Sequence, residues 1–175
     1  KTISIAVRNL RRGVPTTKLP WLPSGIFLWI SISNLYKNFL EKPVSDFFVG
    51  RGFKAFREVK IGYCRADLVA FKDNIATAIE LKLNDRKKAI IQAKNYQLAS
   101  DYVYLAFPLM KSYSILRKSE HILKKEGIGL LTVHEETCKV SKIINPQLSK
   151  RKFTSITIQE IKKRRNYRID KFNIY

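Results

Sequence analysis

Two acidic residues and a lysine are the side chains of this sequence whose types and spacing suit chemistry. Asp67 stands in the run RADLVAF, and Glu80 and Lys82 stand in the run ATAIELKL, both otherwise mostly apolar. Mg²⁺ takes oxygen ligands and is usually held by one or two carboxylates together with water and phosphate oxygens. A lysine beside such an ion can stabilise charge on a phosphate or help to deprotonate a water. The three residues therefore predict a metal site suited to phosphate ester chemistry.

The two runs predict a β-hairpin that brings the acids together. Asp73-Asn74 lies between them and is turn chemistry that tolerates positive φ. A two-residue loop gives the register Lys72:Ile75, Ala70:Thr77, Leu68:Ile79 and Asp67:Glu80, which places the last two Cβ atoms about 4.5–5.5 Å apart. Facing carboxylates repel, and a bound divalent cation would offset that cost. The plainer alternative is an ion pair in which Lys82 bridges either acid on a half-exposed hairpin.

A helix is expected directly after the hairpin. Asn84 or Asp85 is a good N-cap, and Ala89, Ala93 and Tyr96 recur at core spacing. Gln92 lies four residues before Tyr96, so the two share a helix face. Taken alone, Gln92 is more typical of a solvated helix position, and Tyr96 is more typical of a core aromatic residue.

These segments together resemble a known family. GYCRADLVAF, IATAIELKL and QAKNY are similar to the PD-(D/E)XK nuclease superfamily, with Asp67 and Glu80-Leu81-Lys82 as its core motif and Gln92-x-x-x-Tyr96 like the helix of RecB-like members. The spacing, with the later segments DYVYLAFP and EGIGLLTV, looks most like archaeal Holliday-junction-resolvase-type proteins and their relatives in archaeal viruses and plasmids. The resemblance covers roughly residues 40–135. Ala66 replaces the proline that names the motif, but that proline is not a metal ligand.

The resemblance implies a set of roles for the site. Asp67, Glu80 and the carbonyl of Leu81 would hold Mg²⁺ or Mn²⁺, Lys82 would position or activate the attacking water, and Gln92 would orient the scissile phosphate or Lys82. Glu41, at the entry of a helix, resembles the additional metal-site acid of resolvase-type members; alternatively it only complements the helix dipole.

Composition points to a nucleic-acid partner. The chain has 175 residues and a formal net charge of +20, which attracts polyanions and makes their binding salt-dependent. An anionic membrane is the rival partner. No predicted cationic helix has a clean apolar face, so we expect no membrane binding. The residues expected to contact nucleic acid are Arg57, Lys60, Arg65, Tyr96, Lys150, Arg151, Lys152, Arg164 and Arg165.

The order of predicted elements gives an α/β fold class: a restriction-endonuclease-like core with a mixed central β-sheet flanked by helices. We expect one compact domain, with a basic N-terminal arm and apolar helix at 1–40, the nuclease core at 41–135 and a basic C-terminal extension at 136–175. The arm and the extension are each either solvated or a DNA or dimer contact. The apolar run at 25–40 suits a core or a homodimer interface.

The sequence thus predicts a metal-dependent DNA endonuclease, with duplex or branched DNA as substrate. Two cysteines and no signal peptide predict an intracellular, cytoplasmic setting, the host cytoplasm if the protein is viral. The competing hypothesis is a non-catalytic DNA-binding or architectural protein that retains the fold.

Overall fold

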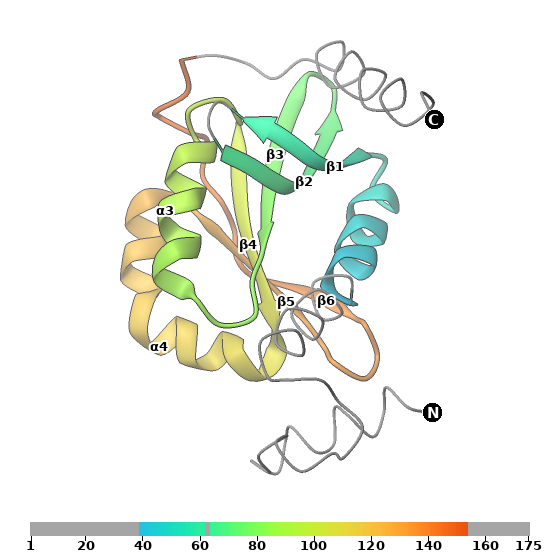
Figure 1. The fold of residues 1–175 in the computed structure, drawn as a ribbon, viewed down its shortest axis with the longest axis vertical. Coiled ribbons are helices and arrows are strands. Elements are labelled where there is room, and N and C mark those ends of the chain that lie inside the picture. The colour runs from blue at the N-terminus through green and yellow to red at the C-terminus, as the bar shows by residue number, and fades with distance from the viewer. Residues whose placement is uncertain (1–38, 62–63, 154–175) are drawn as a thin grey trace, which may run out of the picture. The chain divides into compact units, whose positions relative to one another are not determined.

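The computed structural model describes residues 39–61 and 64–153 (Figure 1). The chain divides into two units, Lys1–Leu35 and Tyr36–Tyr175, and every described residue belongs to the second. Most of the predicted N-terminal arm, as well as Arg164 and Arg165, therefore lies outside the described residues. Within the described residues, no helix is long and apolar enough to cross a membrane.

A mixed six-stranded β-sheet organises the described chain, which confirms the predicted α/β class (Figure 1). The strands lie side by side in chain order, and β3 runs parallel to β4 and β4 to β5, whereas the other neighbours are antiparallel. Their bounds are β1 Lys54–Ile61, β2 Cys64–Lys72, β3 Ile75–Leu81, β4 Tyr102–Pro108, β5 Gly129–Val133 and β6 Val140–Ile144.

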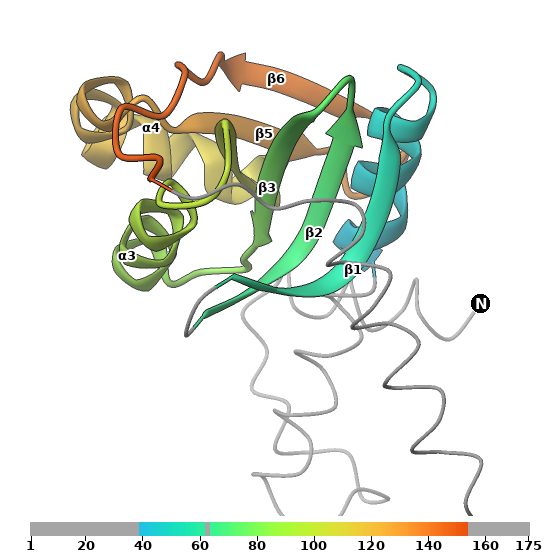
Figure 2. The same ribbon diagram turned by 90° about the horizontal axis from the view of Figure 1, so that it is seen from above.

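Helices cover both faces of this sheet, as Figure 2 shows. Helices α3 (Arg86–Tyr96) and α4 (Leu109–Glu126) lie on one face and enclose a core that includes Ala93, Tyr96 and Leu123. A helix over residues 39–49 covers the other face, where Leu40 and Val44 are among the residues that pack into a second core. This helix already includes residues 39 and 40, so it extends beyond the predicted start at Glu41. Burial on both faces explains the mostly apolar strands at the centre of the sheet.

The β2–β3 hairpin has the predicted turn and register. Asp73 and Asn74 adopt φ angles of 49° and 63°, as both central residues of a two-residue type I′ turn require. The strands pair at Lys72:Ile75, Ala70:Thr77 and Leu68:Ile79, as expected. Asp67 precedes Leu68 on β2 and Glu80 follows Ile79 on β3, so the two acids come directly after the Leu68:Ile79 pair.

The two described helices after the hairpin differ in how well their faces are predicted. Helix α3 begins after Asp85, whose carboxylate accepts a 3.0 Å hydrogen bond from the Lys88 amide, and it buries Ala89, Ala93 and Tyr96 as expected. In α4 the helical spacing of Tyr113, Leu116, Ile122 and Leu123 predicts a core-facing side, but Tyr113 is 68% exposed. The buried positions of α4 are Ser112, Ile115, Ser119 and Leu123. Two of these buried positions are serines, which a hydrophobic periodicity does not detect.

The sheet continues beyond the predicted core boundary at residue 135. Strand β6 pairs antiparallel with β5, although 136–175 was expected to be an extension. After β6 the chain returns to the helical face, where the amides of Gln147 and Ser149 donate to the carbonyls of Gly127 and Asp101. The first part of the predicted extension is thus built into the fold.

Gly129 of β5 is a point where the fold has no room for a side chain. A Cβ there would lie 2.5 Å from two ring carbons of Tyr104 on β4 and 3.1 Å from the Ile144 carbonyl oxygen. We expect Gly129→Ala to lower the free energy of unfolding by about 1–3 kcal/mol, because overpacking forces neighbours to shift. Urea denaturation measures the change. The same substitution in a Tyr104→Val background should cost less, and an equal cost in both backgrounds would show that the ring contact is not the cause.

Candidate functional site

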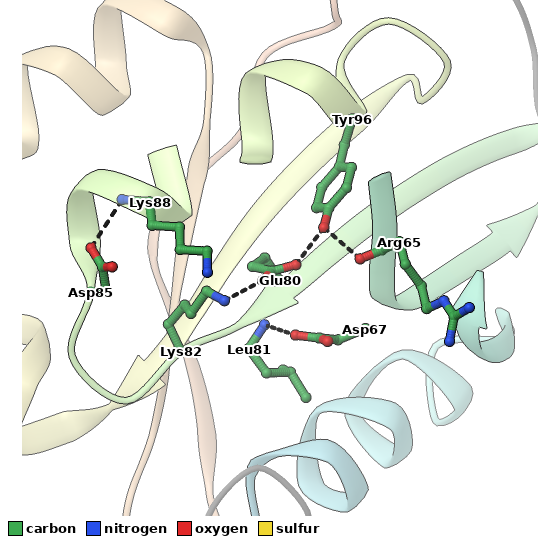
Figure 3. Close-up of polar contacts among 8 residues, drawn as sticks. All are labelled: Arg65, Asp67, Glu80, Leu81, Lys82, Asp85, Lys88 and Tyr96. Carbon is green, nitrogen blue, oxygen red and sulfur yellow. Dashed lines mark hydrogen bonds and ion pairs between the residues drawn. The ribbon is translucent and has the colours of Figure 1, made fainter. Parts of the chain in front are cut away.

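The two predicted acids meet in the interior of the protein (Figure 3). Asp67 is 6% exposed and Glu80 is 1% exposed, although they carry carboxylates on neighbouring strands. Asp67 Oδ2 accepts a 2.8 Å hydrogen bond from the amide of Leu81, so the side chain of one acid is bonded to the backbone beside the other. The hairpin therefore holds the pair of acids in one fixed arrangement.

Glu80 has a different protein partner on each of its oxygens (Figure 3). The Lys82 ammonium lies 2.8 Å from Oε1, and the Tyr96 hydroxyl lies 2.6 Å from Oε2. The same hydroxyl is 2.7 Å from the carbonyl oxygen of Arg65, so it bridges α3 to both strands. The Lys82 side chain is 23% exposed, which makes it the part of this group that reaches solvent. Asp67, Glu80 and Lys82 thus converge as predicted.

The electrostatics of the pair are unfavourable. Burial raises the pKa of the Glu80 carboxyl above its ordinary value of 4.5, and the Asp67 charge raises it further, while Lys82 and Tyr96 act in the opposite direction. Burial and the bond to Glu80 also raise the pKa of the Tyr96 phenol, so the phenol remains a donor. An ordinary stability role does not account for two carboxylates held together out of water.

This donor set fits a divalent cation. Two carboxylates offer hard oxygen ligands, and Mg²⁺ commonly needs no more than one or two from the protein. The described chain contains no group of three or more His, Cys, Asp or Glu residues arranged as metal ligands. The residues present therefore suit an ion that keeps several waters rather than one enclosed by protein. The Leu81 carbonyl, predicted as a further ligand, keeps that role as a prediction.

Glu41 has a partner of its own in this structure. Its carboxylate Oε1 lies 2.7 Å from Nε of Arg57 on β1, with the Glu41 side chain 13% exposed and that of Arg57 63% exposed. Its predicted metal role, like the nucleic-acid role of Arg57, stays a prediction, and each would compete with this ion pair.

Gln92, on the helix that also carries Tyr96, has a buried side-chain oxygen without a partner among the described residues. It lies on α3 one turn before Tyr96, and its Oε1 is buried without a hydrogen bond from the described residues. A buried acceptor without a donor costs about 1–3 kcal/mol, so this oxygen is available to a water or another donor. Its predicted role in orienting the scissile phosphate or Lys82 stays a prediction.

The position of Tyr96 in the structure does not agree with its predicted contact with nucleic acid. Its side chain is 0% exposed, and its hydroxyl is used by Glu80 and the Arg65 carbonyl. We therefore assign it the role of holding the Glu80 carboxylate. The spacing Gln92-x-x-x-Tyr96 indicated which helix face the ring occupies, but a sequence does not show which strand atom its hydroxyl reaches.

Several of the basic residues expected to bind nucleic acid carry ion pairs within the fold, as Arg57 does. Arg65 lies 3.5 Å from Glu58, Arg151 lies 2.9 Å from Glu126, and Lys152 lies 2.6 Å from Asp101, so these three carry ion pairs. The pairs of Arg151 and Lys152 fasten the segment after β6 to the helical face. Lys60 and Lys150 are exposed.

The described chain is thus an α/β protein with a mixed sheet whose central hairpin carries a buried pair of carboxylates and a lysine. No protein-family profile matches it, and no curated protein is similar to it at a significant level. It is similar to the solved structure of an XisH family protein from Nostoc punctiforme, with 16% identity, 61% of this chain and 99% of that chain covered, and a TM-score of 0.49. An fdxN element excision controlling factor protein from Anabaena variabilis is similar at 17% identity, with 62% and 99% covered and a TM-score of 0.49.

Tyr96→Phe tests the hydroxyl's part in holding Glu80. We expect a loss of about 1–3 kcal/mol in the free energy of unfolding, because the variant removes the one hydroxyl proton for which the buried Glu80 Oε2 and the Arg65 carbonyl oxygen are both acceptors. Chemical denaturation measures it, and Tyr113→Phe on the exposed face of α4 is the matched control. Equal stability of the two variants would contradict the bridge.

Proposed function

We propose that the protein is a metal-dependent DNA nuclease that hydrolyses phosphodiester bonds, with Mg²⁺ or Mn²⁺ as its cofactor. The observation that carries the proposal is the buried pair of Asp67 and Glu80 on adjacent strands, with the Lys82 ammonium 2.8 Å from Glu80. The pairing has an electrostatic cost that a divalent cation would relieve, and the same residues make up the motif of the nucleases that the sequence resembles.

Each residue has a distinct part in the proposed reaction. Asp67 and Glu80 would hold the ion, which when bound supplies a Lewis acid at the phosphate and lowers the pKa of water. Lys82 Nζ would donate a hydrogen bond to the attacking water or to a phosphate oxygen, since its side chain reaches solvent. Tyr96 would hold the Glu80 carboxylate in place through the hydrogen bond from its hydroxyl to Oε2. The unsatisfied Oε1 of Gln92 would accept a hydrogen bond from water or from Lys82.

We propose DNA as the partner because the chain carries a large positive net charge. A chain with a net charge of +20 gains affinity for polyanions by releasing their counterions, without reading bases. Branched DNA, as in resolvase-type relatives, is the substrate we propose to test first. Action as a homodimer in the cytoplasm is part of the same proposal.

A second candidate is a DNA-binding protein without catalysis, and one observation favours it. Both oxygens of Glu80 are occupied by side chains of the protein itself, and the described residues provide no third acid for a ligand cluster. In that case the lysine would neutralise the acids in place of a metal ion. DNA binding would then be insensitive to metal.

Cleavage of labelled DNA separates the two candidates. A four-way junction, a linear duplex and a single strand are each incubated with Mg²⁺, Mn²⁺ or EDTA, beside Glu80→Ala. We expect metal-dependent cutting that the variant loses, with the preferred substrate distinguishing a resolvase from a general nuclease. Tight, salt-sensitive binding without cutting under any metal would favour the non-catalytic candidate.

A further inference from the structure

Lys88, in the first turn of α3, is a second lysine directed at the candidate site. Its amide is fixed by the Asp85 side chain at 3.0 Å, which sets the direction in which the residue leaves the helix. Figure 3 shows the Lys88 side chain extending from α3 toward Lys82, with its ammonium end on the same side of the site. Lys88 is exposed and belongs to the run Arg86-Lys87-Lys88, in which the sequence alone does not distinguish it from its neighbours.

Fold stability does not explain this lysine. Lys82 has Glu80 as its counter-ion, whereas no ion pair joins Lys88 to an acid of the described chain. The first turn of α3 contains no acidic residue, and cations there oppose the helix dipole at a cost of about 0.3–1 kcal/mol each. Arg86 has a structural use, because its Nη1 donates to Ser119 Oγ at 2.6 Å on α4. The Lys88 side chain has no comparable contact with the residues that the structure describes.

The charges at the candidate site indicate which kind of ligand Lys88 would bind. With a divalent cation bound, as the proposed function requires, the negative charges of Asp67 and Glu80 are neutralised, and the two positive charges of Lys82 and Lys88 are in excess at the site. Two ammonium groups directed at the same space repel each other, and an anion between them would reverse that repulsion. The only large anion in the proposed reaction is the DNA backbone.

We propose that Lys88 is a phosphate-binding residue, which contacts a backbone phosphate of DNA seated over Lys82. The inference rests on the proposed function for the identity of the ligand, and it assigns to Lys88 a contact that orients the strand at the acids. Loss of this contact removes one phosphate interaction and leaves the fold intact.

Metal-free DNA binding tests the contact without relying on catalysis. Affinity for a labelled duplex is measured in EDTA against NaCl concentration for the wild type, Lys88→Gln, Lys88→Arg and Lys87→Gln. Lys87→Gln is the matched control, since it removes the same charge from the same turn about 100° around the helix. We expect Lys88→Gln to reduce the salt slope by about 0.9, which corresponds to roughly eightfold weaker binding at 0.1 M salt. We expect Lys88→Arg to restore it and Lys87→Gln to leave the slope unchanged.

Neutralising single phosphates locates the contact. In a scan of methylphosphonate substitutions across a four-way junction, whose branch point fixes where the protein binds, the wild type should lose affinity at one phosphate, and Lys88→Gln should be insensitive there. If Lys88→Gln and Lys87→Gln behave alike, or no position couples to Lys88, the inference is overturned, even if the wild type cleaves DNA. If the coupling is found but no metal supports cleavage, the phosphate contact stands and the proposed nuclease function fails.

Discussion

Cleavage of DNA by Glu80→Gln is expected to fall by at least about 10³-fold, whichever substrate the wild type prefers. The substitution removes one of two carboxylates available to the ion, and a Lewis acid at the phosphate is worth several kcal/mol, with each 1.36 kcal/mol amounting to a factor of ten. Binding of DNA in EDTA should change less than about threefold. Single-turnover cleavage and anisotropy titration measure the two effects separately.

The same variant is expected to be more stable than the wild type when no metal is present. Because burial and Asp67 raise the pKa of Glu80, the ionised carboxylate disfavours the fold above pH 4.5, the ordinary value for this side chain. Glutamine removes that charge and keeps an acceptor for Tyr96. We expect a melting temperature in EDTA about 2–4 °C higher at neutral pH, as roughly 1 kcal/mol produces in a chain of this size. The difference should vanish below pH 4.5, where Glu80 is protonated in both states.

Glu120→Gln is the control for both measurements, since Glu120 is an exposed acid of α4 that pairs with Lys124. It should leave cleavage and melting temperature unchanged. Cleavage retained by Glu80→Gln would remove Glu80 from the site. A variant that lost cleavage and also melted lower than the wild type would show that the acid is a structural partner of Lys82.

Lys82→Met is expected to reduce cleavage by about 10²- to 10³-fold, the usual range for loss of one donor that stabilises charge in the transition state. Its effect on stability should have the opposite sign to that of Glu80→Gln. The variant leaves Glu80 Oε1 without its 2.8 Å partner, so the free energy of unfolding should fall by about 1–3 kcal/mol at neutral pH. Below pH 4.5 this loss should shrink, because a protonated Glu80 needs no counter-ion.

A double-variant cycle isolates the pair. Glu80→Gln in the Lys82→Met background should recover part of the lost stability, because the two side chains are in direct contact. Lys142→Met, at an exposed lysine of β6, is the control for removing a positive charge. Additive effects of the two substitutions would show that Lys82 and Glu80 do not interact in solution.

The hairpin and the site motif could be predicted because their determinants are local. Asp73 and Asn74 are residues that accept positive φ, and a two-residue turn fixes the register of everything that follows on both strands. Alternation along the strands then places Asp67 and Glu80 on one face. Residues far away in the chain are not needed for any of these steps.

Features that depend on packing between distant segments were not predictable in the same way. The Tyr96 hydroxyl meets Glu80 and Arg65 because α3 packs at one particular height on the sheet, which no periodicity encodes. The buried face of α4 contains Ser112 and Ser119, so its hydrophobic pattern pointed to Tyr113 instead. Strand β6 is short and half polar, because an edge strand needs few buried side chains.

The order of the strands also bears on how the protein folds. Each strand of the sheet lies beside its neighbour in the chain, so no pairing has to wait for a distant segment to arrive. The β2–β3 hairpin closes a loop of only two residues, Asp73 and Asn74. Hairpins form in about 1–10 μs, whereas pairing across long loops is slower. We therefore expect the two acids to meet early, while water still surrounds them and before Tyr96 covers Glu80. The two carboxylates are then brought together in water, where their repulsion is weakest. They become buried only after the hairpin has formed.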